Sequence, residues 1–73
     1  MQYTVVVHSA EEGGYLVDVP SLPGCFSQGE TIDEAMKNGT EAIELHIHGL
    51  KDDCQEVPNE EGLVIRRVDV KAA

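Results

Sequence analysis

Hydrophobic and polar residues alternate along two stretches near the start of the chain, residues 2–8 and 15–19. In the first stretch Tyr3, Val5 and Val7 share one side of an extended chain. A period of two predicts a strand with one buried face. The link between the two stretches, AEEGG, is short and contains two glycines. It therefore predicts an antiparallel hairpin.

A third, shorter strand is predicted over residues 25–29, after the segment PSLPG. Each proline in that segment removes a backbone donor and fixes φ, so the segment ends the ladder of the hairpin. Because no strong strand follows directly, we expect the third strand at an edge of the sheet, where proline and glycine neighbours are tolerated.

Beyond residue 30 the spacing of apolar residues changes to three and four, which is typical of one helix face. Thr31 to Glu34 (TIDE) form a capping box. In it the Thr31 hydroxyl can accept from the Glu34 amide, and the Glu34 carboxylate can reach back to the Thr31 amide. Gly49 is a stop signal near the other end. The apolar face of the predicted helix contains Ile32, Ala35, Met36, Gly39, Ala42, Ile43, Ile47 and Leu50.

Residues 51–62 are polar and predict a loop, and residues 63–70 (LVIRRVDV) predict a last strand. The element order β-β-β-α-β makes residues 1–73 a single α+β domain. Two hairpins and a right-handed helical crossover place the last strand beside the first and parallel to it. We therefore predict a four-stranded mixed sheet of order 3-2-1-4 with the helix on one face. The other face is expected to stay wet or to form a dimer surface.

Negative charge dominates the chain, with fourteen Asp and Glu against five Lys and Arg, a formal net charge of −9. Residues 1–65 hold thirteen acids against two lysines, a net −11, whereas residues 66–73 hold three basic residues against one acid, a net +2. Such a body repels phosphate backbones and anionic lipid, so we expect no direct nucleic-acid or membrane partner. The acidity favours a basic protein partner, or it serves solubility alone.

The length of 73 residues limits the core. A chain this short buries only roughly 60% of the surface that its unfolded form exposes. Additional stability is expected from self-association, so we predict a homo-oligomer, a dimer or tetramer. The N-terminal residues show no secretory pattern, and no apolar run approaches the roughly 20 residues of a membrane span. A cytoplasmic protein with reduced thiols is expected.

Several sequence motifs together resemble the HicB-like antitoxin family. They are the strand YTVVV, the stretch GGYLVDVPSLPGCFSQGET (residues 13–31) and the helix pattern EA…N…EAIEL (residues 34–45). The resemblance implies a partial ribonuclease-H-like fold. It also implies a domain that binds and blocks HicA, a small basic toxin that cleaves messenger RNA. Longer members add a C-terminal DNA-binding domain, which the three residues after Val70 do not provide, so operator binding is not expected. The alternative is a stand-alone oligomeric adaptor or small-ligand-binding domain with no toxin partner.

Candidate catalytic and metal-binding patterns are weak. Two-metal phosphoryl chemistry needs clustered carboxylates, but residues 2–8 carry none, and Asp18 and Asp69 are isolated on different predicted strands. Nothing indicates a nucleophile with an oxyanion hole. We therefore predict no enzyme, no cofactor and no metal. The residues considered as zinc ligands lack the close pairing typical of zinc sites: Cys25, His46, His48 and Cys54.

Candidate partner contacts are acids on predicted loops and one leucine on the polar side of the predicted helix. The acids are Glu11, Glu12, Glu60 and Glu61, and the leucine is Leu45. Rim acids would steer a basic partner. A lone exposed leucine is ordinary on protein surfaces, and otherwise it marks contact with another chain.

Overall fold

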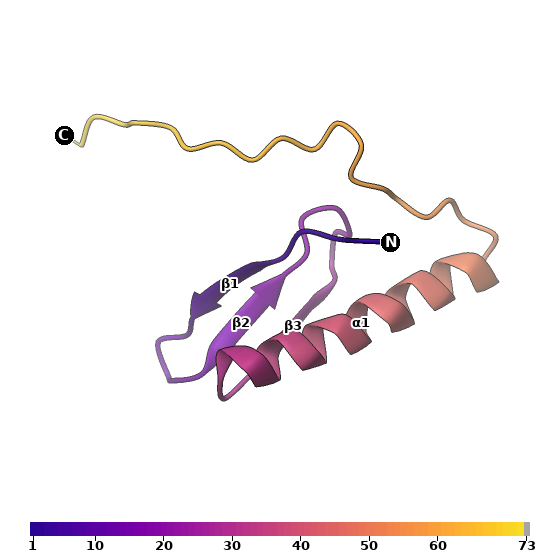
Figure 1. The fold of residues 1–73 in the computed structure, drawn as a ribbon, viewed down its shortest axis with the longest axis horizontal. Coiled ribbons are helices and arrows are strands. Elements are labelled where there is room, and N and C mark those ends of the chain that lie inside the picture. The colour runs from indigo at the N-terminus through magenta and orange to yellow at the C-terminus, as the bar shows by residue number, and fades with distance from the viewer. Residues whose placement is uncertain (73) are drawn as a thin grey trace.

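The computed structural model describes residues 1–72; Ala73, the last residue of the predicted domain, lies outside the described residues. The strands form one antiparallel sheet of order β1-β2-β3, and the helix lies across one face of it (Figure 1). The α+β class, the two hairpins and the edge position of the third strand are confirmed. The elements are β1 (Val6–Ser9), β2 (Tyr15–Asp18), β3 (Phe26–Gly29) and α1 (Ile32–Asp52).

Two glycines allow α1 to approach the sheet closely. Val17, at the centre of the sheet, is paired with Val7 on β1 and Ser27 on β3 and is fully buried. On the helix, a β-carbon at Gly39 would stand 3.2 Å from a methyl group of Val17. Gly29, at the end of β3, meets the backbone of the first helical turn, where a β-carbon has no room. Both positions therefore need glycine for close packing rather than for flexibility.

The helix begins at the predicted capping box with one difference. The Thr31 hydroxyl accepts from the Glu34 amide (3.1 Å), as predicted. The Glu34 carboxylate accepts from the Glu30 amide (3.3 Å) instead of the Thr31 amide. The helix also passes Gly49, which keeps a helical backbone, and its last residue is Asp52. This α1 is amphipathic, and the described chain has no helix long and apolar enough to cross a membrane.

The core lies between α1 and the loop that follows β2. Val19, Leu22 and Cys25 are buried together there. The Leu22 amide donates to the Val19 carbonyl (3.0 Å), and the Cys25 amide donates to the Leu22 carbonyl (2.9 Å). These bonds fold the loop back so that the Leu22 side chain is fully buried. Partly buried residues pack around this group: Tyr3, Val5, Ala42, Ile43, Ile47 and Leu50.

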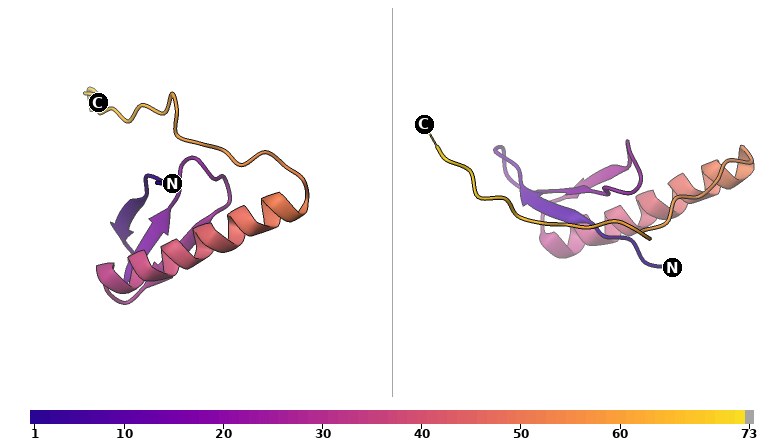
Figure 2. Two further views of the ribbon diagram at one scale, coloured as in Figure 1. Left: turned by 45° about the vertical axis from the view of Figure 1, so that its right-hand side comes forward. Right: turned by 90° about the horizontal axis from the view of Figure 1, so that it is seen from above.

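The predicted fourth strand is not found. Residues 63–70, which we call the tail, are extended but pair with none of the three strands, so the predicted order 3-2-1-4 does not form (Figures 1 and 2). A turn closed by the Leu63 amide on the Glu60 carbonyl (3.0 Å), with Gly62 at φ 87°, leads the tail away from the sheet. The radius of gyration is 14.3 Å, whereas about 11 Å is expected of a compact chain of this length.

Candidate functional site

Residues 58–60 hold the start of the chain through hydrogen bonds that we call the clasp. The Tyr3 hydroxyl donates to the Pro58 carbonyl. The Glu60 carboxylate accepts from the Thr4 amide (2.6 Å), the Thr4 hydroxyl (2.9 Å) and the Ser21 hydroxyl (3.2 Å). The Thr4 amide is the main cause of a Glu60 pKa below its ordinary value; the two hydroxyls add to this effect and partial desolvation opposes it.

The clasp explains where β1 begins. The alternation predicted a strand over residues 2–8, but pairing with β2 starts only at Val6. The reason is that Tyr3 and Thr4 are hydrogen-bonded to residues 58–60. The clasp joins Thr4 to a residue 56 positions away, so no local pattern reveals it. Its consequence is that the tail originates beside the N-terminal end of β1.

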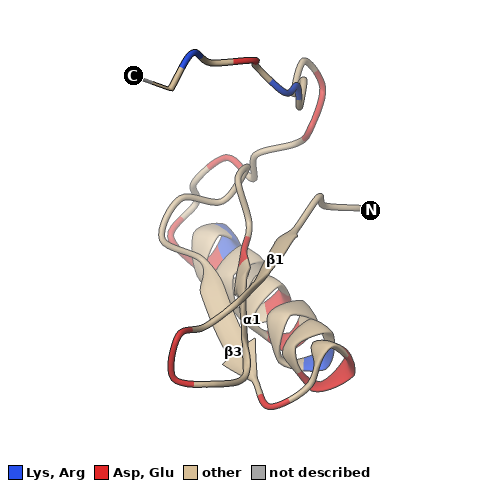
Figure 3. Ribbon diagram, turned by 90° about the vertical axis from the view of Figure 1, so that its left-hand side faces the viewer, with Lys and Arg blue, Asp and Glu red and all other residues tan. Residues whose placement is uncertain are grey.

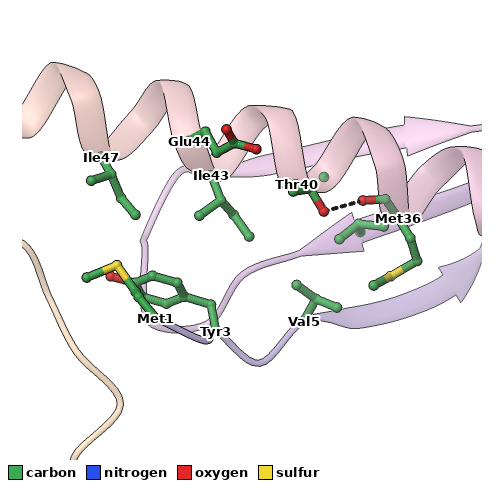
Figure 4. A pocket seen from close by; sticks show the side chains of 10 residues that line it. Met1, Tyr3, Val5, Met36, Thr40, Ile43, Glu44 and Ile47 are labelled. Atoms are coloured by element: carbon green, nitrogen blue, oxygen red, sulfur yellow. Dashed lines mark hydrogen bonds between the residues drawn. The ribbon is translucent and has the colours of Figure 1, made fainter.

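An apolar cleft of about 460 Å³ opens between the first residues of the chain and the middle of α1. Figure 4 shows Ile43 and Ile47 pointing from the helix toward Tyr3 and Val5. The Thr40 hydroxyl in its wall donates to a helix carbonyl (2.9 Å) and is therefore already satisfied. The wall is mainly hydrocarbon, which suits apolar side chains better than a charged ligand.

Exposed carboxylates gather at the end of the molecule where β1 turns into β2 and β3 leads into α1 (Figure 3). Glu11 and Glu12 lie in the first of these turns, and Glu30 and Glu34 line a polar hollow beside it. Asp33 adds a further carboxylate in the first helical turn. We call these five residues the acidic end. Sequence reasoning selected Glu11 and Glu12 but missed the other three, although the hairpin and the helix start place them together.

The structure separates the five residues predicted to contact a partner. Glu11 and Glu12 belong to the acidic end. Leu45 lies on the outer side of α1 and is 73% exposed. The oxygens of Glu60 are engaged in the clasp, and Glu61 follows it at the surface. Because the clasp precedes β1 and the acidic end follows it, these two regions lie at opposite ends of that strand.

The side chains considered as metal ligands stay apart. Cys25 is buried, and this burial raises the pKa of its thiol, whereas Cys54 is exposed. On α1, His46 is half-buried and His48 is exposed, with 3.4 Å between Nε2 of His48 and Oδ2 of Asp52. Within residues 1–72, no group of three or more His, Cys, Asp or Glu side chains is placed to hold a metal ion.

The sheet, the helix, the acidic end and the apolar cleft define a small two-layer α+β domain with surface features suited to contacts with other proteins. The family model described as "HicB_like antitoxin of bacterial toxin-antitoxin system" matches residues 3–71. This chain belongs to the HicB-like antitoxin family, and the resemblance drawn from residues 13–31 and 34–45 is confirmed.

Similar proteins extend this assignment. UPF0150 protein Ta0767 of Thermoplasma acidophilum is 47% identical over 60 residues, covering 82% of this chain and 87% of that protein. Antitoxin HicB 1 of Photorhabdus laumondii is 33% identical over 58 residues, covering 80% of this chain but 37% of that antitoxin.

Solved structures show the same fold. The crystal structure of the Burkholderia pseudomallei antitoxin HicB matches with a TM-score of 0.73 at 38% identity, over 90% of this chain and 53% of that one. The N-terminal domain of that antitoxin matches with a TM-score of 0.70 at 34% identity, over 99% of this chain and 100% of that one. This chain therefore corresponds in fold to the N-terminal domain of a longer antitoxin.

Proposed function

We propose that this chain is the antitoxin of a toxin–antitoxin pair and that it binds a small basic HicA-like toxin, covering the toxin's RNA-binding face. The observation that carries the proposal is membership of the HicB-like antitoxin family in a chain with a net charge of −9. The chain acts by binding and not by catalysis. The complex forms in the cytoplasm, where messenger RNA is cleaved.

The acidic end is the surface that we assign to the toxin. A protein that holds RNA presents Lys and Arg side chains to phosphates. Carboxylates at Glu11, Glu12 and Glu30 offer those side chains competing partners and steer the two proteins together. Leu45 supplies an exposed apolar contact on α1. Glu60 has no such role, because its oxygens are already bonded within the chain.

Co-expression tests this proposal. The toxin candidate to test is a short basic protein, sought among the reading frames that neighbour the gene of this chain, and growth rescue and co-purification are the readouts. The wild-type chain should rescue growth and co-purify with the toxin candidate. The double variant Glu11→Lys, Glu12→Lys should lose both effects. The matched control Asp53→Lys, Glu56→Lys changes the charge equally in the exposed loop after α1 and should retain them.

The association rate provides a second readout. Charge steering is screened by salt, so the association rate should fall as ionic strength rises, and the charge-reversed variant should show less of this dependence. A wild-type chain that neither binds nor neutralises the toxin candidate would refute the proposal.

The alternative function is a stand-alone oligomeric adaptor or small-ligand-binding domain without a toxin. The apolar cleft favours it, since about 460 Å³ falls within the range of roughly 300–1,000 Å³ typical of ligand pockets. An apolar fluorescent dye that binds the wild-type chain and is displaced by a cell extract from which proteins have been removed would favour this alternative.

A further inference from the structure

Five of the eight tail residues are apolar, and four of these side chains are largely exposed within residues 1–72. Val64 is 72% exposed, Ile65 60%, Val68 80% and Val70 87%. In an extended chain, successive side chains point to opposite faces. Val64, Val68 and Val70 therefore lie on one face of the tail and Ile65 lies on the other. A tail of this composition is suited to a strand and is unfavourable in water.

In the part of the chain that the structure describes, the outer edge of β1 is also without a partner strand. The sheet order leaves β1 paired with β2 alone, so the backbone donors and acceptors on its other side point away from the sheet. The edge contains no proline and no bulge that would prevent a further strand from pairing. It is therefore a template for one additional strand.

The apolar cleft lies beside this same edge. Helix α1 packs against β3 and β2 and hardly touches β1, so the two layers separate on the β1 side. Tyr3 and Val5, which lead into β1, form one wall of the cleft, and Ile43 and Ile47 form the other. A strand paired with β1 would direct every second side chain toward this space. Valine and isoleucine side chains match its hydrocarbon walls.

We propose that the occupant is the tail of a second copy of this chain, and that two copies exchange tails so that each sheet gains its fourth strand from the other. Exchange about a two-fold axis satisfies both edges and both clefts at once. The tail carries Arg66 and Arg67, and Lys71 follows it, so residues 66–73 hold a net charge of +2, whereas residues 1–65 hold a net −11. Attraction between these two parts favours the exchange.

The path of the chain favours a second copy over the chain's own tail. The clasp fixes residue 60 beside Thr4, and the turn to Leu63 then leads the tail off the sheet. In two views the tail passes the sheet without packing on it (Figures 1 and 2). Pairing with its own β1 requires this turn to open, whereas pairing with a second copy leaves it intact. This inference is independent of the proposed toxin, since it needs only this chain.

Light scattering of the purified full chain at micromolar concentration tests the exchange. The wild-type chain should have twice the mass of the 7.9 kDa monomer. The variant Ile65→Asp, Val68→Asp should halve that mass and keep its helical circular dichroism, because both side chains are exposed within a single copy. The control Leu45→Asp, also at an exposed apolar residue, should remain a dimer. A monomeric wild type, or a dimer that survives the double substitution, would overturn the proposal.

Cross-linking separates exchange from pairing within one copy. Ser9→Cys, at the end of β1, and Val68→Cys, in the tail, are made separately in a Cys54→Ser background, leaving Cys25 buried. Mixing the two variants after mild unfolding and refolding, then adding a short bis-maleimide, should join one copy of each. A chain carrying both cysteines that is linked only within itself would show that the tail pairs with its own sheet and would refute the exchange.

Discussion

Leu22→Ala is the substitution whose effect on stability follows most directly from the fold. The Leu22 side chain is fully buried among Val19, Cys25 and the helix, although it belongs to a loop rich in proline and glycine. Removing a buried leucine side chain costs about 2–5 kcal/mol, depending on how far the site collapses. The loop can relax partly toward the helix, so we expect a loss of about 3 kcal/mol in the free energy of unfolding.

This loss is large for a chain of 73 residues. Domains of this size are stable by about 4–11 kcal/mol. With a urea m-value of about 1 kcal/mol/M, the unfolding midpoint should fall by about 3 M. Leu45→Ala is the matched control, because the same substitution at an exposed helix position should change stability by less than about 0.5 kcal/mol.

Urea titrations of both variants, followed by circular dichroism at equal protein concentration, measure the difference; equal concentration matters because self-association shifts apparent stability. A Leu22→Ala midpoint within about 1 M of wild type, at the m-value used above, would refute the placement of Leu22 in the core. Equal losses for Leu22→Ala and Leu45→Ala would refute it as well.

Three further experiments test separate parts of the structure. Because the pKa of Glu60 is lowered in the folded chain, the clasp contributes stability above the ordinary glutamate pKa and loses it as pH falls through the lowered value. Glu60→Gln should remove this acid-dependent part of the thermal unfolding profile, and an unchanged profile would contradict the clasp. Gly29→Ala should destabilise by about 1–3 kcal/mol through overpacking against the helix backbone. By contrast, Gly49→Ala, in open space within α1, should stabilise by about 0.5–1 kcal/mol; equal effects in thermal melts would contradict the packing. Iodoacetamide at pH 8 should label Cys54 well before Cys25, whose thiol is buried with a raised pKa. Mass spectrometry of digests measures this order, and labelling of Cys25 first would contradict the burial of its thiol.

Local patterns predicted most of the elements because those elements depend on local physics. The period of two identified the hairpin strands, and the capping box fixed the start of α1 at Ile32 after Thr31. The helix stripe correctly selected the buried positions Ala35 and Gly39. Leu45 was also placed correctly on the exposed side, since its position follows from helical spacing alone.

Features that depend on distant contacts were missed. The late start of β1 and the clasp both arise from hydrogen bonds between residues more than 50 positions apart. The fourth strand was predicted from a good local pattern in residues 63–70, but a strand also needs an accessible edge, and the turn at Gly62 leads this segment away from its own sheet. Alternation shows that a segment is suited to pairing without showing which chain supplies the partner.

The acidic end was predicted only in part for a related reason. Glu11 and Glu12 stand out because they occupy a loop, whereas Glu34 is explained locally by the capping box. Its membership of a shared surface appears only when the β1–β2 turn and the start of α1 are brought together.

The central claim is that this chain neutralises a toxin by binding it. The most direct measurement is RNA cleavage by the purified toxin candidate, with increasing amounts of the chain added. Cleavage should fall to zero at a fixed ratio of the two proteins, and the Glu11→Lys, Glu12→Lys variant should fail to suppress it. Cleavage that continues at full rate with the wild-type chain in excess would contradict the account.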